Sequence, residues 1–395
     1  MPVTGEPNVR VHPAISSIDA ATWDRLAAPE GVPVNPFVTH AFLAALERSG
    51  SVGGRTGWRP CHLTLEQDGE ITGAAPCYLK THSKGEYIFD YGWAEAYERA
   101  GGKYYPKLQI AVPFTPVPGR RLLVGSGDGA EAREQMLMAG AIALAGELDA
   151  SSVHATFVTD GEWSRTGAAR GWLQRTDQQF HWQNAGYDTF DDFLASLASR
   201  KRKAVRRERA EAMNAGLAIE HVTGAAITEA HWDAFFTFYI ETGSRKWGRP
   251  YLNRKFFSML GEAMADRCLL VMARRDGDYV AGALNLIGGD CLYGRYWGCT
   301  EHHPFLHFEI CYYQAIEIAI ARKLARVEAG AQGEHKLARG YMPTPTYSVH
   351  WIADAGFRKA VARYLAEERQ FMDQQRAALA EYGPYKKSEG AVDHD

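Results

Sequence analysis

LLVMARRDGDYVAGALNLIGG, residues 269–289, is the stretch that decides the fold. Asp276-Gly277 lies between two apolar runs, and an Asp-Gly pair in this setting is a strong signal for a β-hairpin turn. The same pattern occurs much earlier in HLTLEQDGEITGAAPCYLK, residues 62–80, where Asp68-Gly69 occupies the turn. The sequence therefore predicts two similar hairpins, one in each half of the chain.

The segments after the two hairpins also correspond. Each hairpin is followed by a run typical of a strand, then a helix, then a second strand. Self-similarity over so long a period indicates two copies of one domain, although hairpins followed by helices are common enough for coincidence to stay the alternative. A helix that crosses between strands of a mixed sheet makes this an α/β fold. The corresponding segments are 111–124, 130–148 and 151–158 in the first half, and 291–299, 308–324 and 325–330 in the second.

Length and composition are those of an ordinary globular protein. The 395 residues suggest two domains as the simplest division, and 46% hydrophobic with 23% charged residues is enough for full cores. We expect a first domain over 1–184, a second over 185–365 that begins with a basic helix, and a C-terminal helix with a frayed tail over 366–395. The formal net charge of −3 argues against a surface that coats nucleic acid, so any polyanion site is local and no DNA partner is expected.

The sequence favours a cytoplasmic location. Six cysteines show no CxxC spacing, which indicates reduced thiols. The N-terminus has no basic segment followed by an apolar run, so no signal peptide is predicted. The most apolar stretch, 136–146, is too short to span a bilayer and predicts a buried helix. Peripheral contact with the inner membrane stays open.

Residues 199–209, SRKRKAVRRER, form a dense basic run near the junction of the two halves. One interpretation is a solvated helix between domains, because runs of charge often have no specific partner. The other is a polyanion site for the phosphates of coenzyme A, an acidic lipid surface or a tRNA backbone. The residues assigned to this site are Arg200, Lys201, Arg202, Lys203 and Arg206.

Residues 90–107 are rich in aromatic side chains and carboxylates and form a candidate amine-binding region. Carboxylates such as Asp90 would bind an ammonium group, and the aromatic rings would form apolar walls. The alternative is a long ordered loop over the core. Residues 247–251, WGRPY, are similar in character. The substrate-binding candidates from these two segments are Trp93, Glu95, Tyr97, Tyr105, Trp247 and Arg249.

A turn after the last predicted strand of the repeat, AQGEHKLARGYMPTPTY at 331–347, is the second candidate region. Its cluster of titratable side chains suggests proton transfer or capture of an anion, because loops held by rigid elements often carry chemistry. A salt-bridged surface loop is the alternative. The side chains in question are Glu334, His335, Lys336, Arg339 and Tyr341.

The histidines in HHPFLHFE, residues 302–309, suggest a metal at first sight. However, Pro304 interrupts the helical pair of His303 and His307, and no second group of ligands is evident. Because metal sites need three or four convergent ligands, we expect no metal centre.

Several long segments resemble one family, the bacterial FemAB-like predicted N-acyltransferases, over about residues 17–380. The resemblance implies a fold of tandem GNAT-like (acyl-CoA N-acyltransferase) domains with mixed central sheets, in agreement with the internal repeat. The matching segments are YGWAEAYERAGGKYYPKLQIAVPFTPVPGRRLL at 91–123, the basic run, KWGRPYLNRKFF at 246–257, GRYWGC at 294–299 and EAGAQGEHKLARGYMPTPTYSVHWI at 328–352.

The resemblance implies an N-acyltransferase that moves an acyl group from an activated carrier to a primary amine. Fem enzymes pass aminoacyl groups from tRNA to the amine of a cell-wall precursor, and relatives of the present type are linked to acyl transfer onto sphingoid amines. We therefore expect acyl-CoA as co-substrate, no tightly bound cofactor, and an amine-bearing lipid or cell-envelope precursor, such as a sphingoid base, as acceptor. The alternatives are tRNA-dependent aminoacyl transfer to a peptidoglycan precursor and a non-catalytic module that binds lipid or precursor. The usual GNAT pyrophosphate loop is missing before the helix near Phe308, so the half that binds the donor stays open.

The expected roles follow from the chemistry of acyl transfer. The attacking amine must lose a proton, and His335 is the first choice of base because imidazole titrates near neutrality. Glu334 or Asp90 would serve instead. Tyr341 or backbone N–H groups would stabilise the tetrahedral oxyanion. The remaining cations of the turn would hold an anionic part of a substrate: Lys336 and Arg339.

Overall fold

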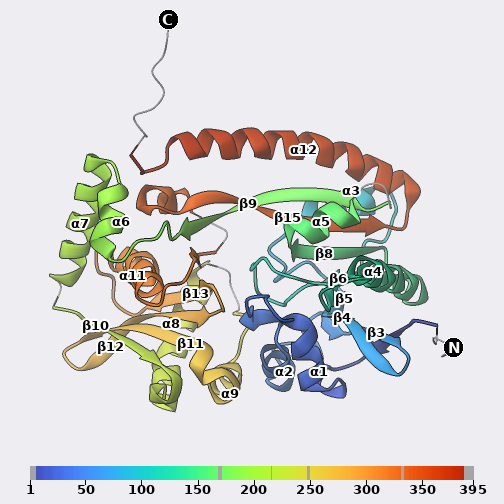
Figure 1. Cartoon of the computed structure of the whole chain (residues 1–395), viewed down its shortest axis with the longest axis horizontal. Coiled ribbons are helices and arrows are strands. Elements are labelled where there is room, and N and C mark those ends of the chain that lie inside the picture. Colours follow the sequence, from blue (N-terminus) through green and yellow to red (C-terminus); the bar gives the residue numbers. More distant parts are fainter. Residues whose placement is uncertain (1–5, 168–170, 215, 247–249, 331–332, 387–395) are drawn as a thin grey trace, which may run out of the picture. The chain divides into compact units, whose positions relative to one another are not determined.

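The computed structural model describes residues 6–167, 171–214, 216–246, 250–330 and 333–386 (Figure 1). The chain forms two compact units. The first consists of residues 1–177, 251–264 and 345–373, and the second of residues 178–250, 265–344 and 374–395. The units are thus not the consecutive segments 1–184 and 185–365 expected from the sequence, because two later segments return to the first unit.

The first unit has two sheets. One is antiparallel, in the order β1 (Asn8–His12), β3 (His62–Gln67), β4 (Glu70–Ala75) and β7 (Leu123–Val124). The other runs in the order β15 (Met342–Ile352), β8 (Ser152–Val158), β6 (Lys107–Ile110), β5 (Cys77–Lys80) and β2 (Trp58–Pro60), and only its β6–β8 pair is parallel. Helix α4 (Ala130–Glu147) joins β7 to β8, and its apolar residues pack with those of β6 and β8 in one core. The other helices of this unit are α1 (Ala20–Ala27), α2 (His40–Arg48), α3 (Tyr91–Arg99), α5 (Asp160–Thr166) and α9 (Arg254–Met264).

The second unit has one mixed sheet. Its order is β10 (Ala218–Thr223), β11 (Cys268–Arg275), β12 (Asp278–Ile287), β13 (Cys291–Cys299), β14 (Arg326–Glu328) and β9 (Leu173–Gln183). Only β13 and β14 are parallel to each other. They are connected through α10 (Leu306–Phe308), the π-helix η6 (Glu309–Tyr313) and α11 (Gln314–Ala321), which pack on the sheet. The other α-helices are α6 (Phe190–Ser196), α7 (Ser199–Met213) and α8 (Glu229–Lys246), and the 3-10 helices are η4 (Gly224–Ala226), η5 (Ala265–Arg267) and η7 (Glu334–Arg339).

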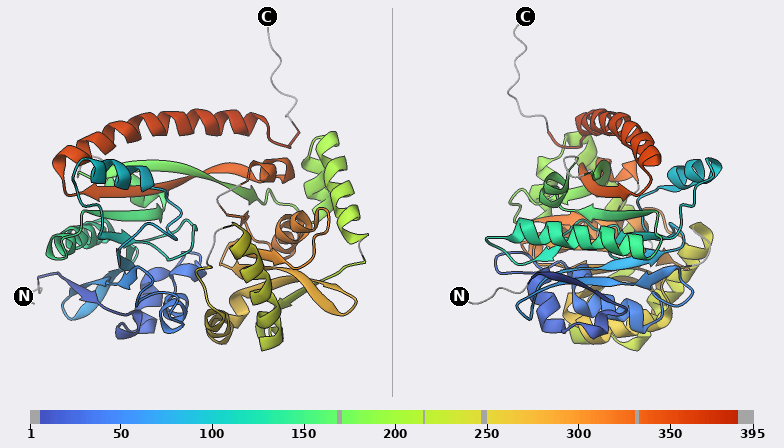
Figure 2. Two further views of the ribbon diagram at one scale, coloured as in Figure 1. Left: turned by 180° about the vertical axis from the view of Figure 1, so that it is seen from behind. Right: turned by 90° about the vertical axis from the view of Figure 1, so that its right-hand side faces the viewer.

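Three elements contain residues of both units: β9, β15 and α12 (Ala355–Glu381), the long red helix in Figures 1 and 2. The predicted buried helix at 136–146 lies within α4. In the part of the chain that the structure describes, no helix has both the length and the apolar character needed to cross a membrane. The six cysteines are all free thiols.

The two predicted hairpins are present and have the same turn. Asp68 and Gly69 have φ values of 53° and 83°, and Asp276 and Gly277 have values of 53° and 95°. Two central residues with positive φ match the twist of the paired strands, which explains the choice of Asp-Gly at both sites. In each unit a strand, a helix and a parallel strand then follow, so the predicted tandem GNAT-like α/β fold is confirmed. The strand predicted at 111–124 is wrong for most of its length, because only Leu123–Val124 is a strand and the paired strand, β6, comes earlier.

Candidate active site

The parallel pair β13–β14 creates a cleft in the second unit. The two strands are hydrogen-bonded only from Cys291 to Tyr293 and from Arg326 to Glu328, whereas β13 continues to Cys299. Past the end of this ladder lies a cavity of about 130 Å³. Its walls come from β12, β13, the helical segment and the residue after β14: Ala283, Asn285, Gly294, Arg295, Tyr296, Trp297, His307, Cys311, Tyr312 and Ala329.

Asn285 is the most unusual residue of this cleft. Its side chain is 1% exposed, and neither its amide nitrogen nor its amide oxygen has a hydrogen-bond partner among the described residues. A register shift in the β12–β13 ladder places Asn285 opposite Gly294, and a Cβ at that glycine would lie 3.5 Å from the Asn285 Oδ1. Burying an unpaired amide costs about 1–3 kcal/mol, so such a group is usually kept where a ligand or water completes its bonds.

A π-helix positions the aromatic wall of the cleft. The segment Glu309–Tyr313 interrupts the helix between α10 and α11, and π-segments of this kind are frequent at functional sites. Tyr312 lies on it and lines the cleft, and its hydroxyl is 3.0 Å from His335 Nε2. Burial raises the pKa of Tyr312 well above its ordinary value, so the phenol stays protonated. Tyr312 therefore links the cleft to an imidazole.

His335 lies at the edge of this cleft rather than in its lining. The side chain is exposed, and its ring centroid is 5.5 Å from that of Phe308 and 5.7 Å from that of Tyr312. Its neighbour Glu334 is also exposed. Any proton that His335 takes from a substrate in the cleft would pass through Tyr312.

Two other residues of the predicted turn have internal partners. Lys336 is buried and donates hydrogen bonds to the carbonyls of Ala329 (2.6 Å) and Gly330 (3.0 Å), and burial lowers its pKa to about 8. Tyr341 is fully buried and donates to the carbonyl of Tyr312 at 3.1 Å. Lys336 as an anion-binding residue and Tyr341 as an oxyanion donor are therefore corrected: both hold the backbone of the site in place.

The fifth residue of the turn, Arg339, is also paired. Its guanidinium forms a two-pronged ion pair with Glu208 at 2.9 Å and lies 3.5 Å from the centre of the Phe308 ring. It also donates to the carbonyl of His335 at 2.7 Å. Arg339 nevertheless contributes to the wall of a second cavity.

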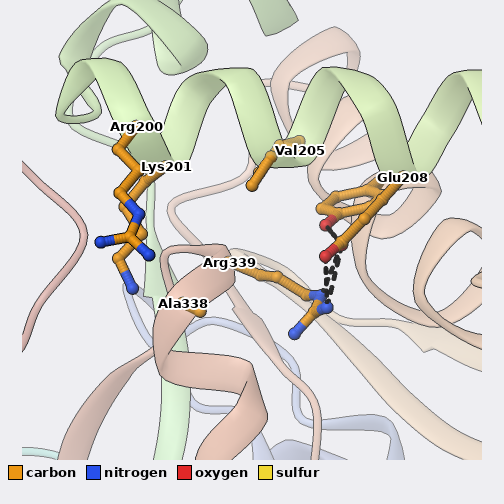
Figure 3. Close-up of a pocket in the computed structure, with 8 residues that line it drawn as sticks. Arg200, Lys201, Val205, Glu208, Ala338 and Arg339 are labelled. Atoms are coloured by element: carbon orange, nitrogen blue, oxygen red, sulfur yellow. Dashed lines mark hydrogen bonds and ion pairs between the residues drawn. The ribbon is translucent and has the colours of Figure 1, made fainter.

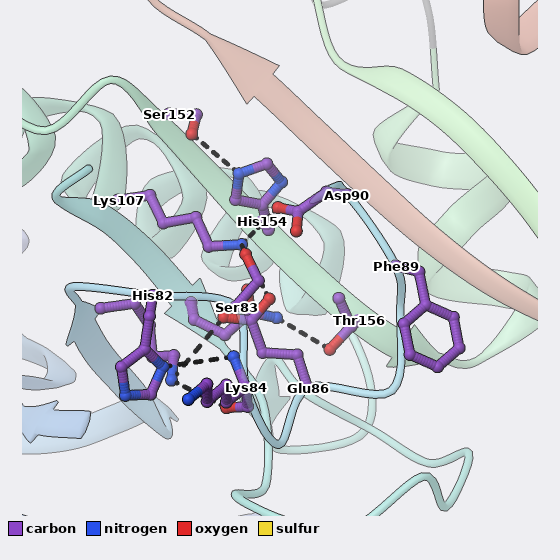
Figure 4. Close-up of polar contacts among 12 residues, drawn as sticks. His82, Ser83, Lys84, Glu86, Phe89, Asp90, Lys107, Ser152, His154 and Thr156 are labelled. Atoms are coloured by element: carbon purple, nitrogen blue, oxygen red, sulfur yellow. Dashed lines mark hydrogen bonds and ion pairs between the residues drawn. The ribbon is translucent and has the colours of Figure 1, made fainter. Parts of the chain in front are cut away.

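Asp90, a predicted base and amine ligand, is in the first unit and is buried at 2% exposure (Figure 4). The amine that it binds is that of Lys107, which also donates to Glu86 at 2.7 Å and Ser83 at 2.9 Å. Burial alone would raise the pKa of Asp90, but the adjacent ammonium group outweighs burial and holds the pKa well below its usual range. Because its lowered pKa makes this carboxylate a weak base and the ammonium group it binds is internal, the structure favours neither role predicted for Asp90.

The aromatic residues around Asp90 also have structural contacts. Trp93 is buried with its ring centroid 5.0 Å from that of His350, and Tyr97 stacks on Phe357 at 4.4 Å. Tyr105 is hydrogen-bonded to the hydroxyl of Ser83 at 2.8 Å. These contacts account for the rings as packing elements of the first unit. Glu95 is exposed and lies 3.7 Å from Arg99, and Trp247 and Arg249 lie outside the described residues.

The basic run forms α7, as predicted, and its cations have different surroundings. Arg206 pairs with Asp191 at 3.1 Å, and Arg209 pairs with Glu309 at 2.9 Å and Glu317 at 2.8 Å. Two other cations of the helix contribute to a cavity of about 350 Å³ in the second unit (Figure 3). Its lining is Arg200, Lys201, Ala204, Val205, Glu208, Tyr313, Ala338 and Arg339.

The residues of the histidine-rich segment also have protein partners. His303 lies 2.9 Å from Glu301, and the carboxylate of Glu309 binds Arg209. Over the described ranges no group of three or more His, Cys, Asp or Glu side chains is arranged to hold a metal ion.

Sequence reasoning missed Asn285 and Tyr312. A signal for the asparagine was present, because it is the one polar side chain in the run AGALNLI and a buried strand rarely keeps an amide without a reason. Tyr312 carried no such signal, since a tyrosine in an apolar helix usually belongs to the core. Its link to His335 depends on the π-turn, which the sequence does not display.

Comparison with known proteins agrees with this architecture. The model of the FemAB-like family, described as peptidoglycan biosynthesis/recognition, matches residues 14–387. A search of the curated proteins finds no significant match.

Solved structures with a similar fold include FemX, at 12% identity and a TM-score of 0.56, with 87% of this chain and 98% of FemX covered. L-PGS from Bacillus licheniformis has 9% identity and a TM-score of 0.50, with coverages of 84% and 97%. A tandem GNAT protein from the clavulanic acid biosynthesis pathway has 13% identity and a TM-score of 0.49, with coverages of 88% and 99%. The likeness to FemX and L-PGS concerns the fold. The family match, in contrast, extends over nearly the whole sequence, and the chain therefore belongs to the FemAB-like family of acyltransferases.

Proposed function

We propose that the protein transfers an acyl group from an activated carrier to a primary amine of a cell-envelope precursor, and that the reaction takes place in the cleft beside Asn285. The family, described as acting in peptidoglycan biosynthesis and recognition, supports a substrate of the cell envelope. The observation that carries the choice of site is the buried, unpaired amide at the point where the β13–β14 ladder ends. An apolar pocket with a few well-placed polar groups is the usual form of a substrate site.

The residues of the cleft suit the steps of acyl transfer. The amine nitrogen bonds to the carbonyl carbon of the donor, and the bond from that carbon to the sulfur or oxygen of the carrier then breaks. Asn285 Nδ2 would donate to the oxygen that becomes negative in the tetrahedral intermediate, since a fixed donor in a dry cleft is most effective there. The Tyr312 hydroxyl would accept the amine proton while passing its own proton to His335 Nε2. The leaving sulfur or oxygen takes up that proton at the end of the reaction.

The size of the cleft limits what it encloses. A volume of about 130 Å³ is below the range of about 300–1,000 Å³ found for sites that bury a drug-sized ligand. The cleft therefore holds the reacting ends of the two substrates, while the carrier and any long acyl chain extend from it. We propose acyl-CoA as the donor and a lipid amine, such as a sphingoid base, as the acceptor, with an aminoacyl ester of tRNA and a peptidoglycan precursor as the alternative pair.

A turnover assay with both pairs tests the proposal. Acyl-CoA with sphinganine is followed by release of free thiol, and labelled aminoacyl-tRNA with a UDP-linked peptidoglycan precursor is followed by transfer of the label. One pair should be turned over, and Asn285→Ala should lower its kcat/KM by about 10²–10³-fold. Turnover that is unaffected by Asn285→Ala would place the chemistry elsewhere, and binding of donor and acceptor with no product would favour a non-catalytic module.

A further inference from the structure

The second cavity of the second unit takes no part in the chemistry proposed above. It has a volume of about 350 Å³ and lies between α7 and the turn at Ala338 and Arg339. Figure 3 shows Arg200 and Lys201 extending from α7 toward that turn, while Arg339 reaches from the turn to Glu208. Cations from two separate elements thus surround one space.

The charges around this cavity are unbalanced. Glu208, its one acidic residue, is engaged by Arg339 at 2.9 Å and also accepts a hydrogen bond from the Tyr313 hydroxyl. Arg200 and Lys201 form no ion pair with any residue in the described ranges. The cavity therefore has two uncompensated positive charges beside a neutralised pair, and an anion would complete it.

The position of these cations is unfavourable for the helix itself. The first turn of α7 contains no acidic residue, and no side chain caps its N-terminus. Cations at this end of a helix oppose the helix dipole, which stabilises anions there by about 0.3–1 kcal/mol each. A sequence that conflicts with local stability in this way is commonly retained for binding. Farther along the helix Arg206 and Arg209 differ from these two residues, because each has a carboxylate partner.

We propose that this cavity binds a compact phosphate group, either a phosphomonoester or a diphosphate, of one of the substrates. The guanidinium of Arg200 and the ammonium of Lys201 would bind its oxygens, and the paired Arg339 would form a fixed cationic wall. That the phosphate belongs to a substrate rests on the proposed function. The geometry and the charge of the cavity support phosphate binding whatever reaction the protein catalyses.

An extended polyanion fits this surface less well than a compact group. A strand of RNA lying along α7 would meet the carboxylates of Asp191 and Glu317, whose side chains are 80% and 45% exposed. The whole chain has a formal net charge of −3, which does not favour a long phosphate backbone. The cavity, in contrast, concentrates its positive charge at one point.

Calorimetry with inorganic pyrophosphate at constant ionic strength tests the inference. The wild type should bind, and the double variant Arg200→Gln/Lys201→Gln should bind about 10–100-fold more weakly, since each charge-assisted bond is strong. A matched variant with the same change of net charge, Arg207→Gln/Arg322→Gln, alters exposed residues outside the cavity and should stay within about twofold of the wild type. Thermal unfolding of all three proteins serves as the control for folding, and a cooperative transition is expected for each.

Two results would overturn the phosphate site: the absence of pyrophosphate binding, and an equal loss of binding in both double variants. Vesicles containing phosphatidic acid separate the two sources of phosphate: binding that pyrophosphate displaces indicates a lipid headgroup, and pyrophosphate binding without vesicle binding indicates a soluble ligand. None of these binding experiments measures turnover. A negative result for the phosphate site is therefore distinct from a negative result in the acyltransferase assay.

Discussion

Replacing Asn285 by alanine should separate activity from stability. The wild-type amide is 1% exposed and without a partner among the described residues, so its burial costs about 1–3 kcal/mol. Removing it relieves that cost and loses only dispersion contacts, each worth about 0.1–0.2 kcal/mol. The free energy of unfolding should therefore stay equal or increase by up to about 2 kcal/mol. If the amide stabilises the oxyanion, kcat/KM should fall by about 10²–10³-fold, which corresponds to about 2.7–4 kcal/mol.

Asn184 is a suitable control in the same unit. Its Nδ2 donates to the carbonyl of Leu324 at 3.1 Å, and its Oδ1 accepts from the backbone N–H groups of Gly186 at 3.1 Å and Tyr187 at 2.9 Å. Asn184→Ala should lower the free energy of unfolding by about 1–3 kcal/mol, because it leaves backbone groups without partners. Its turnover per folded molecule should equal that of the wild type.

Urea unfolding and steady-state kinetics on the two variants test whether the Asn285 amide serves catalysis or the fold. The expected result is opposite behaviour: Asn285→Ala is stable and inactive, and Asn184→Ala is active and less stable. If Asn285→Ala instead unfolds as readily as Asn184→Ala and keeps its turnover, the amide is bonded within the resting protein and serves the fold. Such a result would refute both the interpretation of the unpaired amide and the location of the site.

The remaining predictions concern the buried charges and the base. Lys107→Met should destabilise the protein by about 3–5 kcal/mol in chemical unfolding, because it leaves Asp90 and Glu86 without their main counter-charge. Lys80→Met should be neutral or stabilising at pH 7, since Lys80 lies 3.7 Å from Glu86 and burial lowers its pKa from 10.5 to about 7. Between these two values the unfolded chain binds more protons at Lys80 than the folded protein does, so this residue makes the free energy of unfolding rise with pH by up to about 1.4 kcal/mol per unit. The variant should lose this contribution and show a smaller rise, which Lys336 still supplies because burial lowers its pKa to about 8. His335→Gln should lower kcat/KM by about 10²-fold without changing the unfolding midpoint, because the side chain is exposed; unaltered turnover would exclude it as the base.

The features that the sequence predicted well are those set by neighbouring residues. The Asp-Gly turns are determined by two adjacent residues that tolerate positive φ, so both hairpins and hence the repeat were readable. Strand β6 was missed because KLQI is short, and one of its polar residues, Lys107, is buried against Ser83, Glu86 and Asp90 from the preceding loop. The residues of the turns were thus enough to predict the fold class, whereas a short buried strand could not be predicted from its own residues.

The site was harder to predict, because the hydrogen-bond and ion-pair partners of a side chain are determined only when the chain folds. The segment Asp90–Lys107 was interpreted as a receptor for a substrate amine, yet the amine it binds is the one at its own end. Likewise the turn at 334–341 has the right residue types, but Lys336 on the 3-10 helix and Tyr341 just after it both donate to backbone carbonyls. The sequence identified the charged and hydroxyl groups, but it could not show which of them already have hydrogen-bond or ion-pair partners within the protein.

The two copies of the fold allow the location of the chemistry to be argued from within the molecule. In the first unit the side of the parallel pair that faces α4 is filled by Leu108, Ile110, Val153 and Ala155, all fully buried. Such packing stabilises that copy, but aliphatic side chains offer no hydrogen bond to a developing oxyanion. In the second unit the corresponding side carries Asn285 next to a cavity, and both polar atoms of its amide lack a partner among the described residues. The first unit also buries polar atoms without a described partner, such as Gln109 Oε1 and the Tyr78 hydroxyl, but these residues alternate along β6 and β5 with the apolar ones that pack with α4. The difference that favours the second unit for the proposed acyl transfer is therefore the position of Asn285, whose unpaired amide lines a cavity that a substrate can enter.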